Sequence, residues 1–456
     1  MSDSGIKGFH LVRYGTPADQ KYLARPFLAT YDQLVVNANM VAHTPGAIAS
    51  FILQHMQSKP YFIDPQTHSF QHDISHIESR SEKSAGQIKR SVRKMIESYG
   101  EPIKTVVGRN RRSLLPSHLS DGKVVRQFCQ RVINFQLEAI SAEAEQDEDA
   151  KYYRFVREKK KLGKVNFGPS MAIAPYFCMT PATFKDWLKV NIDCATCSLE
   201  SDEKIGIQVV ITRDLLVEPT MCEQLVKAYA KLKPASFLIW VDGFSEHKAA
   251  LHQLVAFVDL LKQLGDCAPV VNLYGGFLSV ALRRCGKVDT LAGVAHGLEY
   301  GESREVVPVG GGLPIAKFYY PAMHKRVPFR EALRVTKNEG GLKSVAAFHR
   351  TVCDCEECKS VIRSDAVSDF EAYGRTHPVS FMRRNQPIAM EYPLPETKDH
   401  CVRHYMWCKE REYDIGLSQD KIIDDLKWTE RLAGTLDLDT VTYAKTWQLV
   451  LGKKRR

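Results

Sequence analysis

The sequence predicts an α/β protein built on a (β/α)8, TIM-like barrel, with a helical basic insertion and a cysteine-rich C-terminal subdomain. Three observations lead to this prediction. Short apolar runs rich in β-branched residues recur along the chain with helical patterns between them, which is typical of a parallel sheet. A highly charged stretch at about 74–165 interrupts the alternation. After the last run, three cysteines fall within six residues, as "CDCEEC" (353–358).

Eight runs carry the strand prediction. Several precede a helical or glycine-rich segment, as "ASFLIWVD" (235–242) precedes "SEHKAALHQLVAFVDLLKQLG". Eight strands that alternate with helices favour a closed barrel over an open sheet. The predicted strands are 33–40, 60–64, 170–177, 205–212, 235–242, 268–274, 290–295 and 313–320.

The length and composition set the domain organisation. The chain has 456 residues, of which 44% are apolar, so it can bury a large core. We expect the barrel to occupy residues 1–345, with the charged, mostly helical insertion at about 74–165. Residues 346–456 then form the C-terminal subdomain.

The positive charge is concentrated in the insertion. The chain has a net charge of +10, and the segment Arg80–Arg112 has 10 Lys/Arg and 3 Asp/Glu. Such a cluster indicates a polyanionic partner, nucleic acid first. The alternative is a solvated helical face without a ligand.

The amino-terminal sequence and the cysteine content indicate the compartment. "MSDSGIKGFH" lacks the pattern of a secretory signal, and no run of 18 apolar residues is present, so we expect a cytoplasmic protein without a membrane span. In such a chain the 12 cysteines are better explained as thiols or metal ligands than as disulfides.

The cysteine cluster predicts a metal site. Thiolates are good Zn²⁺ ligands, and a structural zinc ion takes four ligands in a tetrahedron. Cys353, Cys355 and Cys358 supply three, which makes 346–456 a zinc-binding C-terminal subdomain with one structural Zn²⁺ per chain. The candidates for the fourth ligand are His377, His400, Cys401, His404 and Cys408.

Polar and glycine residues follow several predicted strands, where the chemistry of a (β/α)8 barrel is located. Asp64 follows "YFI", Asp242-Gly243 follow "LIWV", and Tyr274-Gly275 follow "VVNL". A carboxylate there can act on an anomeric carbon or move protons, and an aromatic ring can stack on a base. The alternatives are that the aspartates form turns and that the aromatic residues belong to the core.

The barrel followed by C-x-C-x-x-C and a later histidine resembles the tRNA-guanine transglycosylases, and more closely their paralogues that insert 7-deazaguanine bases into DNA. The resemblance covers about 30–73 and 170–420. It implies exchange of guanine for a 7-deazaguanine base through a covalent enzyme–nucleic acid intermediate. It also implies a structural zinc ion and the possibility of a dimer or of partner proteins.

The resemblance also assigns residues. "KDHCVRHYMWC" matches the position of the fourth zinc ligand, which makes His400 the first choice and His404 the second. "FIDPQTHSFQ" resembles the strand that ends in a base-contacting general acid/base, here Asp64. "GIQVVITRDLL" assigns Gln208 to base recognition, and "WVDGFSE" assigns Gly243 to backbone contact with the base.

The position that corresponds to the nucleophile of the family is Ala292, in "VDTLAGVAHGLEYGESR" (288–304). Three alternatives follow. The correspondence is shifted along the chain, or Asp242 or Glu299 takes the role of the nucleophile, or the chain does not form the covalent bond. Asp289 is a further candidate for the reactive carboxylate.

The function expected from these residues is base exchange in nucleic acid, in DNA before tRNA. The alternatives are a tRNA-guanine transglycosylase, a non-catalytic nucleic-acid-binding subunit of such a complex, and a hydrolase that uses water in place of the second base.

Overall fold

The structure is a computed structural model. It describes residues 5–54, 59–79, 84–146, 148–159, 168–298, 301–307, 315–383, 386–414, 418–436 and 438–452. The chain forms two compact units, whereas the sequence analysis placed the boundary after residue 345. Unit 1 comprises Met1–Ser245, His252–Gly276 and Val288–Pro308, and unit 2 comprises Glu246–Leu251, Phe277–Lys287 and Val309–Arg456. Among the described helices, none combines the length and hydropathy needed to cross a membrane.

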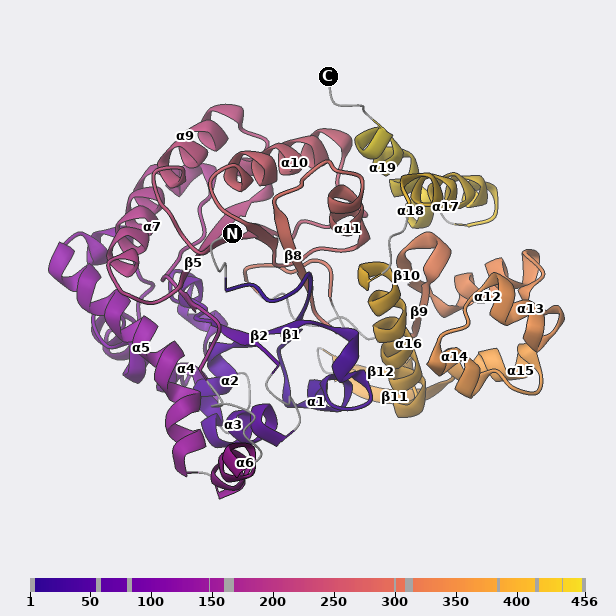
Figure 1. Ribbon diagram of the computed structural model, residues 1–456, viewed down its shortest axis with the longest axis horizontal. Coiled ribbons are helices and arrows are strands. Elements are labelled where there is room, and N and C mark those ends of the chain that lie inside the picture. The colour runs from indigo at the N-terminus through magenta and orange to yellow at the C-terminus, as the bar shows by residue number, and fades with distance from the viewer. Residues whose placement is uncertain are drawn as a thin grey trace. The chain divides into compact units, whose positions relative to one another are not determined.

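Unit 1 is a nearly closed barrel of eight strands, all parallel, in the order β3-β2-β1-β8-β7-β6-β5-β4. The two end strands adjoin, and Ser170 N donates to Tyr61 O at 2.7 Å between them. Figure 1 shows the strands ringed by helices. The predicted fold class is confirmed. The strands are β1 (His10–Tyr14), β2 (Gln33–Asn37), β3 (Tyr61–Asp64), β4 (Ala172–Ile173), β5 (Ile205–Thr212), β6 (Ser236–Asp242), β7 (Val270–Asn272) and β8 (Leu291–His296).

The helices between these strands complete the βα alternation. They are α1 (Gln20–Leu23), α2 (Ala38–His43), α3 (Pro45–Gln54), α4 (Arg90–Tyr99), α5 (Gly122–Gln146), α6 (Glu148–Lys159), α7 (Phe184–Leu199), α8 (Arg213–Leu216), α9 (Pro219–Tyr229), α10 (Leu251–Gly265) and α11 (Phe277–Arg284), of which α11 is assigned to unit 2.

Two strand predictions need correction. The run 313–320 contains β9 (Lys317–Tyr320), which pairs antiparallel with β10 (Lys325–Pro328) in unit 2 and is not part of the barrel. The missing barrel strand is β1, which the sequence analysis did not identify because His10 and Arg13 interrupt its apolar character. Both residues are buried and paired, His10 with His296 and Arg13 with Asp64.

The charged insertion is mostly helical, as predicted, but part of it belongs to the barrel. Helix α5 packs against α7 and β4. Its buried Gln136 donates to Ile173 O and accepts from Ile173 N, both at 2.8 Å. Helix α5 is therefore the helix of the βα unit between β3 and β4. The elements inserted into this unit are mainly those between β3 and α5, such as α4.

Unit 2 is built from two hairpins and several helices around one core. Helix α16 (Pro395–Asp414) packs against β9 and α14 (Glu356–Val361), and the ring of Phe318 stacks on His404 in this core. The remaining elements are α12 (Phe329–Asn338), α13 (Val345–Thr351), α14 (Glu356–Val361), α15 (Ala366–Phe370), β11 (Thr376–Arg383), β12 (Gln386–Pro393), α16 (Pro395–Asp414), α17 (Gln419–Arg431), α18 (Leu438–Val441) and α19 (Tyr443–Gly452).

Candidate functional site

The carboxyl end of the barrel holds a buried charge pair. Asp64 is the last residue of β3, and Arg13 is the last but one of β1. Their side chains are 1% and 4% exposed, and Arg13 Nη2 lies 2.9 Å from Asp64 Oδ2. Arg13 Nη2 also donates to Asn37 Oδ1 at 2.6 Å. The predicted location of Asp64 at a strand end is therefore what the structure shows, but its partner Arg13 was missed.

A chain of hydrogen bonds extends from Asp64. Tyr176 OH donates to Asp64 Oδ1 at 2.5 Å, and His68 Nδ1 lies 3.0 Å from the same hydroxyl. Because the Tyr176 proton points to the carboxylate, His68 Nδ1 must carry its own proton, which leaves Nε2 as an acceptor. Burial lowers the pKa of His68 to about 3, so the imidazole is neutral at neutral pH.

The charge of Asp64 is fixed by these neighbours. Burial alone would raise its pKa, but the Arg13 guanidinium, His68 and the Tyr176 hydroxyl together hold the pKa below its usual range. Asp64 is therefore an ionised carboxylate at neutral pH. It can accept hydrogen bonds or stabilise positive charge, but it has no proton to donate as a general acid.

Aromatic rings flank this charge pair. Tyr274 lies with its ring 4.7 Å from the Arg13 guanidinium carbon, and its ring centroid is 4.9 Å from that of Trp240. His68 meets Trp240 edge-on at 5.0 Å. Arg304 covers both rings, since its guanidinium lies about 6 Å from each and its Nη1 donates to Tyr274 OH at 3.1 Å. The predicted Tyr274 is thus part of the cluster, and Trp240 and Arg304 join it.

Polar side chains without protein partners line the inner face of β5. Both amide atoms of Gln208 and the hydroxyl of Thr212 have no hydrogen-bond partner among the described residues, and Gln208 is 1% exposed. Gln208 lies four residues before the end of β5, and its amide makes no hydrogen bond to Asp64. Unsatisfied buried amides are costly, so this interior accommodates water or a polar ligand.

Three other predicted residues lie at the same end but outside the buried cluster. Asp242 ends β6, and its Oδ1 accepts from Val306 N at 2.6 Å. Gly243 has φ +58°, a conformation that favours glycine. Gly275 N donates to Ala295 O, and a Cβ on Gly275 would lie 2.5 Å from a neighbouring side chain, so the backbone there is closely packed.

The nucleophile position is not at this end of the barrel. Ala292 is the second residue of β8, near its amino end, and Asp289 is exposed before that strand. A nucleophile at the position of Ala292 would lie near the amino end of β8, away from the carboxyl end of the barrel where Asp64 lies. The predicted correspondence of Ala292 with the family nucleophile therefore does not fit the barrel. Glu299 lies outside the described residues.

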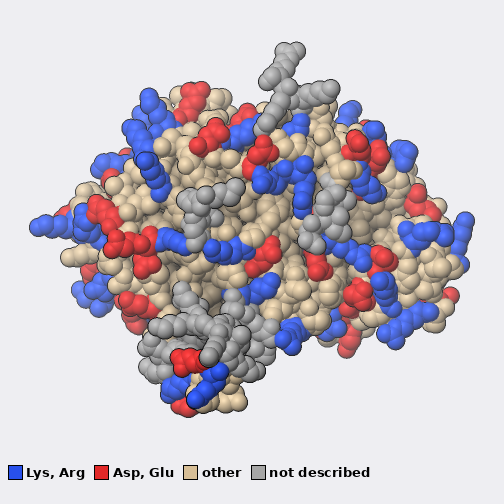
Figure 2. All heavy atoms as spheres, in the orientation of Figure 1, with Lys and Arg blue, Asp and Glu red and all other residues tan. Residues whose placement is uncertain are grey.

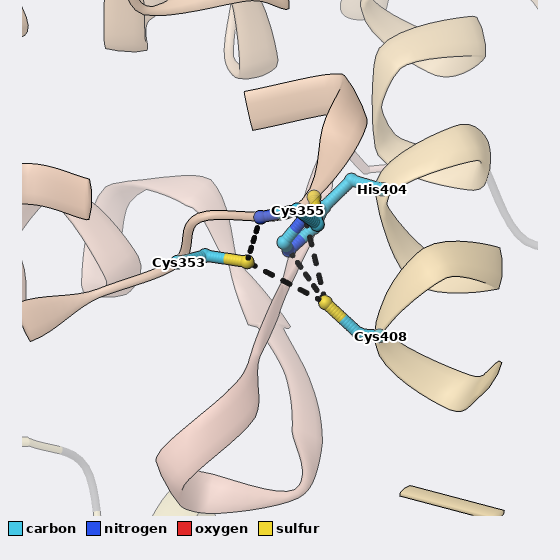
Figure 3. A group of neighbouring side chains, drawn as sticks. All are labelled: Cys353, Cys355, His404 and Cys408. Atoms are coloured by element: carbon cyan, nitrogen blue, oxygen red, sulfur yellow. Dashed lines mark hydrogen bonds between the residues drawn. The ribbon is translucent and has the colours of Figure 1, made fainter. Parts of the chain in front are cut away.

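Unit 2 contains the metal-binding group. Cys353, Cys355, His404 and Cys408 are all buried, and their ligand atoms lie within 4.8 Å of one another, so the group can bind one metal ion. Figure 3 shows that two cysteines come from the turn before α14 and that His404 and Cys408 come from α16. They are four residues apart on that helix and therefore share a face. Two of the three predicted cysteines, Cys353 and Cys355, are thus confirmed in a Cys3His group, and its third cysteine is Cys408 in place of Cys358.

A fifth donor adjoins this group. Cys358 Sγ lies 3.3 Å from His404 Nδ1, the same distance as Cys355 Sγ. His404 Nε2 lies 2.7 Å from Tyr319 O, and donation to this carbonyl orients Nδ1 toward the sulfurs. Burial alone would lower the pKa of His404, but the thiolates of Cys355 and Cys353 raise it to about 10. The centre of the group is therefore strongly attractive to a cation.

His400, the first choice for the fourth ligand, has a different partner. Its Nδ1 lies 2.7 Å from Glu357 Oε1, and its side chain is 28% exposed. His400 lies one helical turn before His404 on α16 and is not part of the group. The structure gives the histidine position to His404, the second choice, and adds Cys408. His377 lies in β11 and is not part of the group.

Comparison of the chain with protein-family models, with curated proteins and with solved structures found no match, so the account of both sites depends on the residues of this chain.

Proposed function

We propose that the protein is a nucleic-acid base-exchange glycosyltransferase, which replaces guanine with a 7-deazaguanine base in DNA in preference to tRNA. The observation that carries the proposal is the buried Asp64–Arg13–Tyr176 cluster beside Trp240 at the carboxyl end of a parallel barrel. Active sites of such barrels lie at this end.

The proposed roles follow from the contacts. The extruded base stacks on Trp240 and Tyr274, in the place that Arg304 covers. Arg13 Nη1, which has no partner among the described residues, and the amide of Gln208 offer hydrogen bonds to a polar ligand inside the barrel. The ionised Asp64 accepts a hydrogen bond from the base or stabilises positive charge at the sugar. The attacking carboxylate is Asp242 or Glu299.

Base exchange is tested directly with labelled guanine. The protein is incubated with guanine-containing DNA, and separately with tRNA, and incorporation into the polymer is measured. Asp64→Ala should abolish incorporation while nucleic-acid binding persists. So should whichever of Asp242→Ala and Glu299→Ala removes the attacking carboxylate. Asp289→Asn is the matched control, because this exposed carboxylate precedes β8 at the other end of the barrel, and it should keep full activity. Wild-type protein that incorporates no base under any condition would refute the proposal.

A non-catalytic nucleic-acid-binding subunit is the second candidate, because both oxygens of Asp64 are already paired. Oδ2 accepts from Arg13, and Oδ1 accepts from Tyr176 OH and Gln66 N. In this case nucleic acid binds without exchange or base release, and the Asp64→Ala variant binds as well as the wild type.

We also propose that the metal is a structural Zn²⁺, one per chain. Thiolate and imidazole ligands in a buried group suit zinc, and the donors outnumber the four that a tetrahedral ion needs, which leaves no open position for water. Metal analysis should give about one Zn²⁺ per chain. Cys355→Ser should lose it, whereas Cys401→Ser should keep it, because Cys401 lies on α16 outside the group. Full metal retention by Cys355→Ser would refute this assignment.

A further inference from the structure

Unit 1 has a cavity of about 570 Å³ in the insertion, between α4, the π-helical turn η6 (Lys104–Arg109) and the segment 86–88. Four cationic side chains and one acidic one line it. The cationic residues are Arg93, Lys104, Arg109 and Arg111, and the acidic residue is Glu97. The formal charge of this lining is therefore +3.

The backbone of η6 aligns two of these cations. In an α-helix, residues five apart point about 140° away from each other. In the π-helical turn, where Asn110 N donates to Thr105 O five residues earlier, residues five apart lie above one another, so Lys104 and Arg109 share a face. Gly108 lets η6 approach α4, since a Cβ there would lie 3.0 Å from Ile96. The cavity therefore depends on a specific local backbone.

Three of the four cations are available for a ligand. Arg111 is held by Glu78 at 2.7 Å and by the Gly86 carbonyl. The exposed side chains of Arg93, Lys104 and Arg109 make no ion pair or hydrogen bond with the described residues. Three unpaired cations around one concavity repel one another, and an anion in the cavity relieves this repulsion.

The cavity is connected to the barrel mouth through α4. Tyr99, on the buried face of this helix, donates its hydroxyl proton to Pro65 O at 2.8 Å. Pro65 directly follows Asp64. The backbone after η6 joins the same segment, because Leu114 N donates to Phe70 O at 2.8 Å. The helix and the turn that line the cavity are therefore anchored to the segment that follows β3.

On the face shown in Figure 2, the basic and acidic side chains of the described residues are interspersed. We infer that the cavity lined by Arg93, Lys104 and Arg109 binds backbone phosphates of a nucleic acid, and so holds the strand whose base enters the barrel. This inference rests on the proposed function for the identity of the polymer, and it adds the place where the backbone is held.

The test is the salt dependence of binding. A fluorescein-labelled DNA duplex and a labelled tRNA are each titrated with wild type and with the triple variant Arg93→Gln, Lys104→Gln, Arg109→Gln between about 50 and 200 mM salt. Each lost phosphate contact reduces the slope of log K against log salt by about 0.9, so the triple variant should lose about 2.7 on duplex DNA. Between about 50 and 200 mM salt, the loss of affinity of the triple variant should then be roughly 40-fold smaller than the loss of affinity of the wild type.

The matched control is Lys227→Gln, Lys231→Gln, Lys233→Gln, which removes the same charge from exposed positions before β6, at the amino end of the barrel. It should keep the wild-type slope. Arg109→Gln alone should lose about 0.9 and serves if the triple variant is not folded by circular dichroism. A slope that is equal in wild type, triple variant and Arg109→Gln, or equal losses in test and control variants, would overturn the inference, as would absence of binding by the wild type.

The labelled-guanine assay on the same samples separates the two proposals. A lower slope without base exchange in the wild type supports the cavity and contradicts the enzyme. Base exchange in the wild type with an unchanged slope in the triple variant supports the enzyme and contradicts the cavity. A larger loss of slope on tRNA than on DNA would identify tRNA as the polymer held there.

Discussion

Removal of one partner of the buried Arg13–Asp64 pair should strongly destabilise the barrel. Asp64→Asn keeps the size and shape of the side chain but removes the negative charge. The NH2 group of the new asparagine would take the place of Oδ2 and face Arg13 Nη2, and two donors cannot bond to each other. The guanidinium would then remain buried at 4% exposure without its counter-charge.

The cost follows from this geometry. Removing one partner of a buried ion pair costs about 3–5 kcal/mol, because the remaining charge is not solvated. Arg13→Met leaves the Asp64 carboxylate in the same position and should cost a similar amount. The double variant Arg13→Met, Asp64→Leu leaves no charge behind, so it should be more stable than either single variant.

Urea unfolding followed by tryptophan fluorescence measures these differences, because Trp240 lies in the cluster. Glu200→Gln is the control. It breaks the exposed pair of Arg126 and Glu200 in the same unit and should leave stability nearly unchanged. The reasoning is refuted if Asp64→Asn costs less than about 1 kcal/mol, or if the effects of the two single variants simply add in the double variant.

The same pair makes stability depend on acid. The pKa of Asp64 is lowered in the folded protein. Its contribution to the free energy of unfolding is therefore complete above the unfolded pKa of about 3.9, and it is lost as the pH falls through the pKa of the folded protein. Asp64→Asn should lack this part of the acid-induced loss.

Three further predictions concern single residues. His404→Ala should release the metal, whereas His400→Ala should retain it, and metal analysis of both variants checks this. Gly275→Ala should lower stability by about 1–3 kcal/mol in urea unfolding, because its methyl group would lie 2.5 Å from two side chains. Burial opposes protonation of His324, but its hydrogen-bonded carboxylate partners, Glu412 among them at 2.7 Å, raise its pKa. The contribution of His324 to the free energy of unfolding is therefore complete below its unfolded pKa of about 6.5. It is lost as the pH rises through the pKa of His324 in the folded protein. Melting curves of His324→Gln should lack this loss of stability at higher pH.

The barrel could be predicted because most of its strands are apolar on both faces. Runs such as 205–212 and 235–242 are buried nearly throughout, as parallel strands covered by helices are. The sequence did not reveal β1 for a physical reason. Its Arg13 and His10 are buried because Asp64 and His296, from distant parts of the chain, pair with them. The opposite error at β9 arose because a buried antiparallel strand has the same composition as a barrel strand.

The sites were predictable to different extents. The cysteine turn is local, so its spacing alone indicated a metal group. The histidine depends on which turn of α16 faces the sulfurs, and that is set by tertiary packing. Likewise, Asp64 was recognisable from its position after a strand. Its partners Arg13 and Tyr176 are 51 and 112 residues away in the sequence, and no local pattern connects them.

The most direct test of the central claim is to trap the covalent intermediate. The purified protein is incubated with DNA, and separately with tRNA, denatured, and analysed by mass for a protein–nucleic acid adduct. The account predicts an adduct on DNA, with the modified peptide containing Asp242 or Glu299. Absence of an adduct on both polymers, together with tight and salt-sensitive binding to one of them, would contradict the enzyme and favour the non-catalytic subunit.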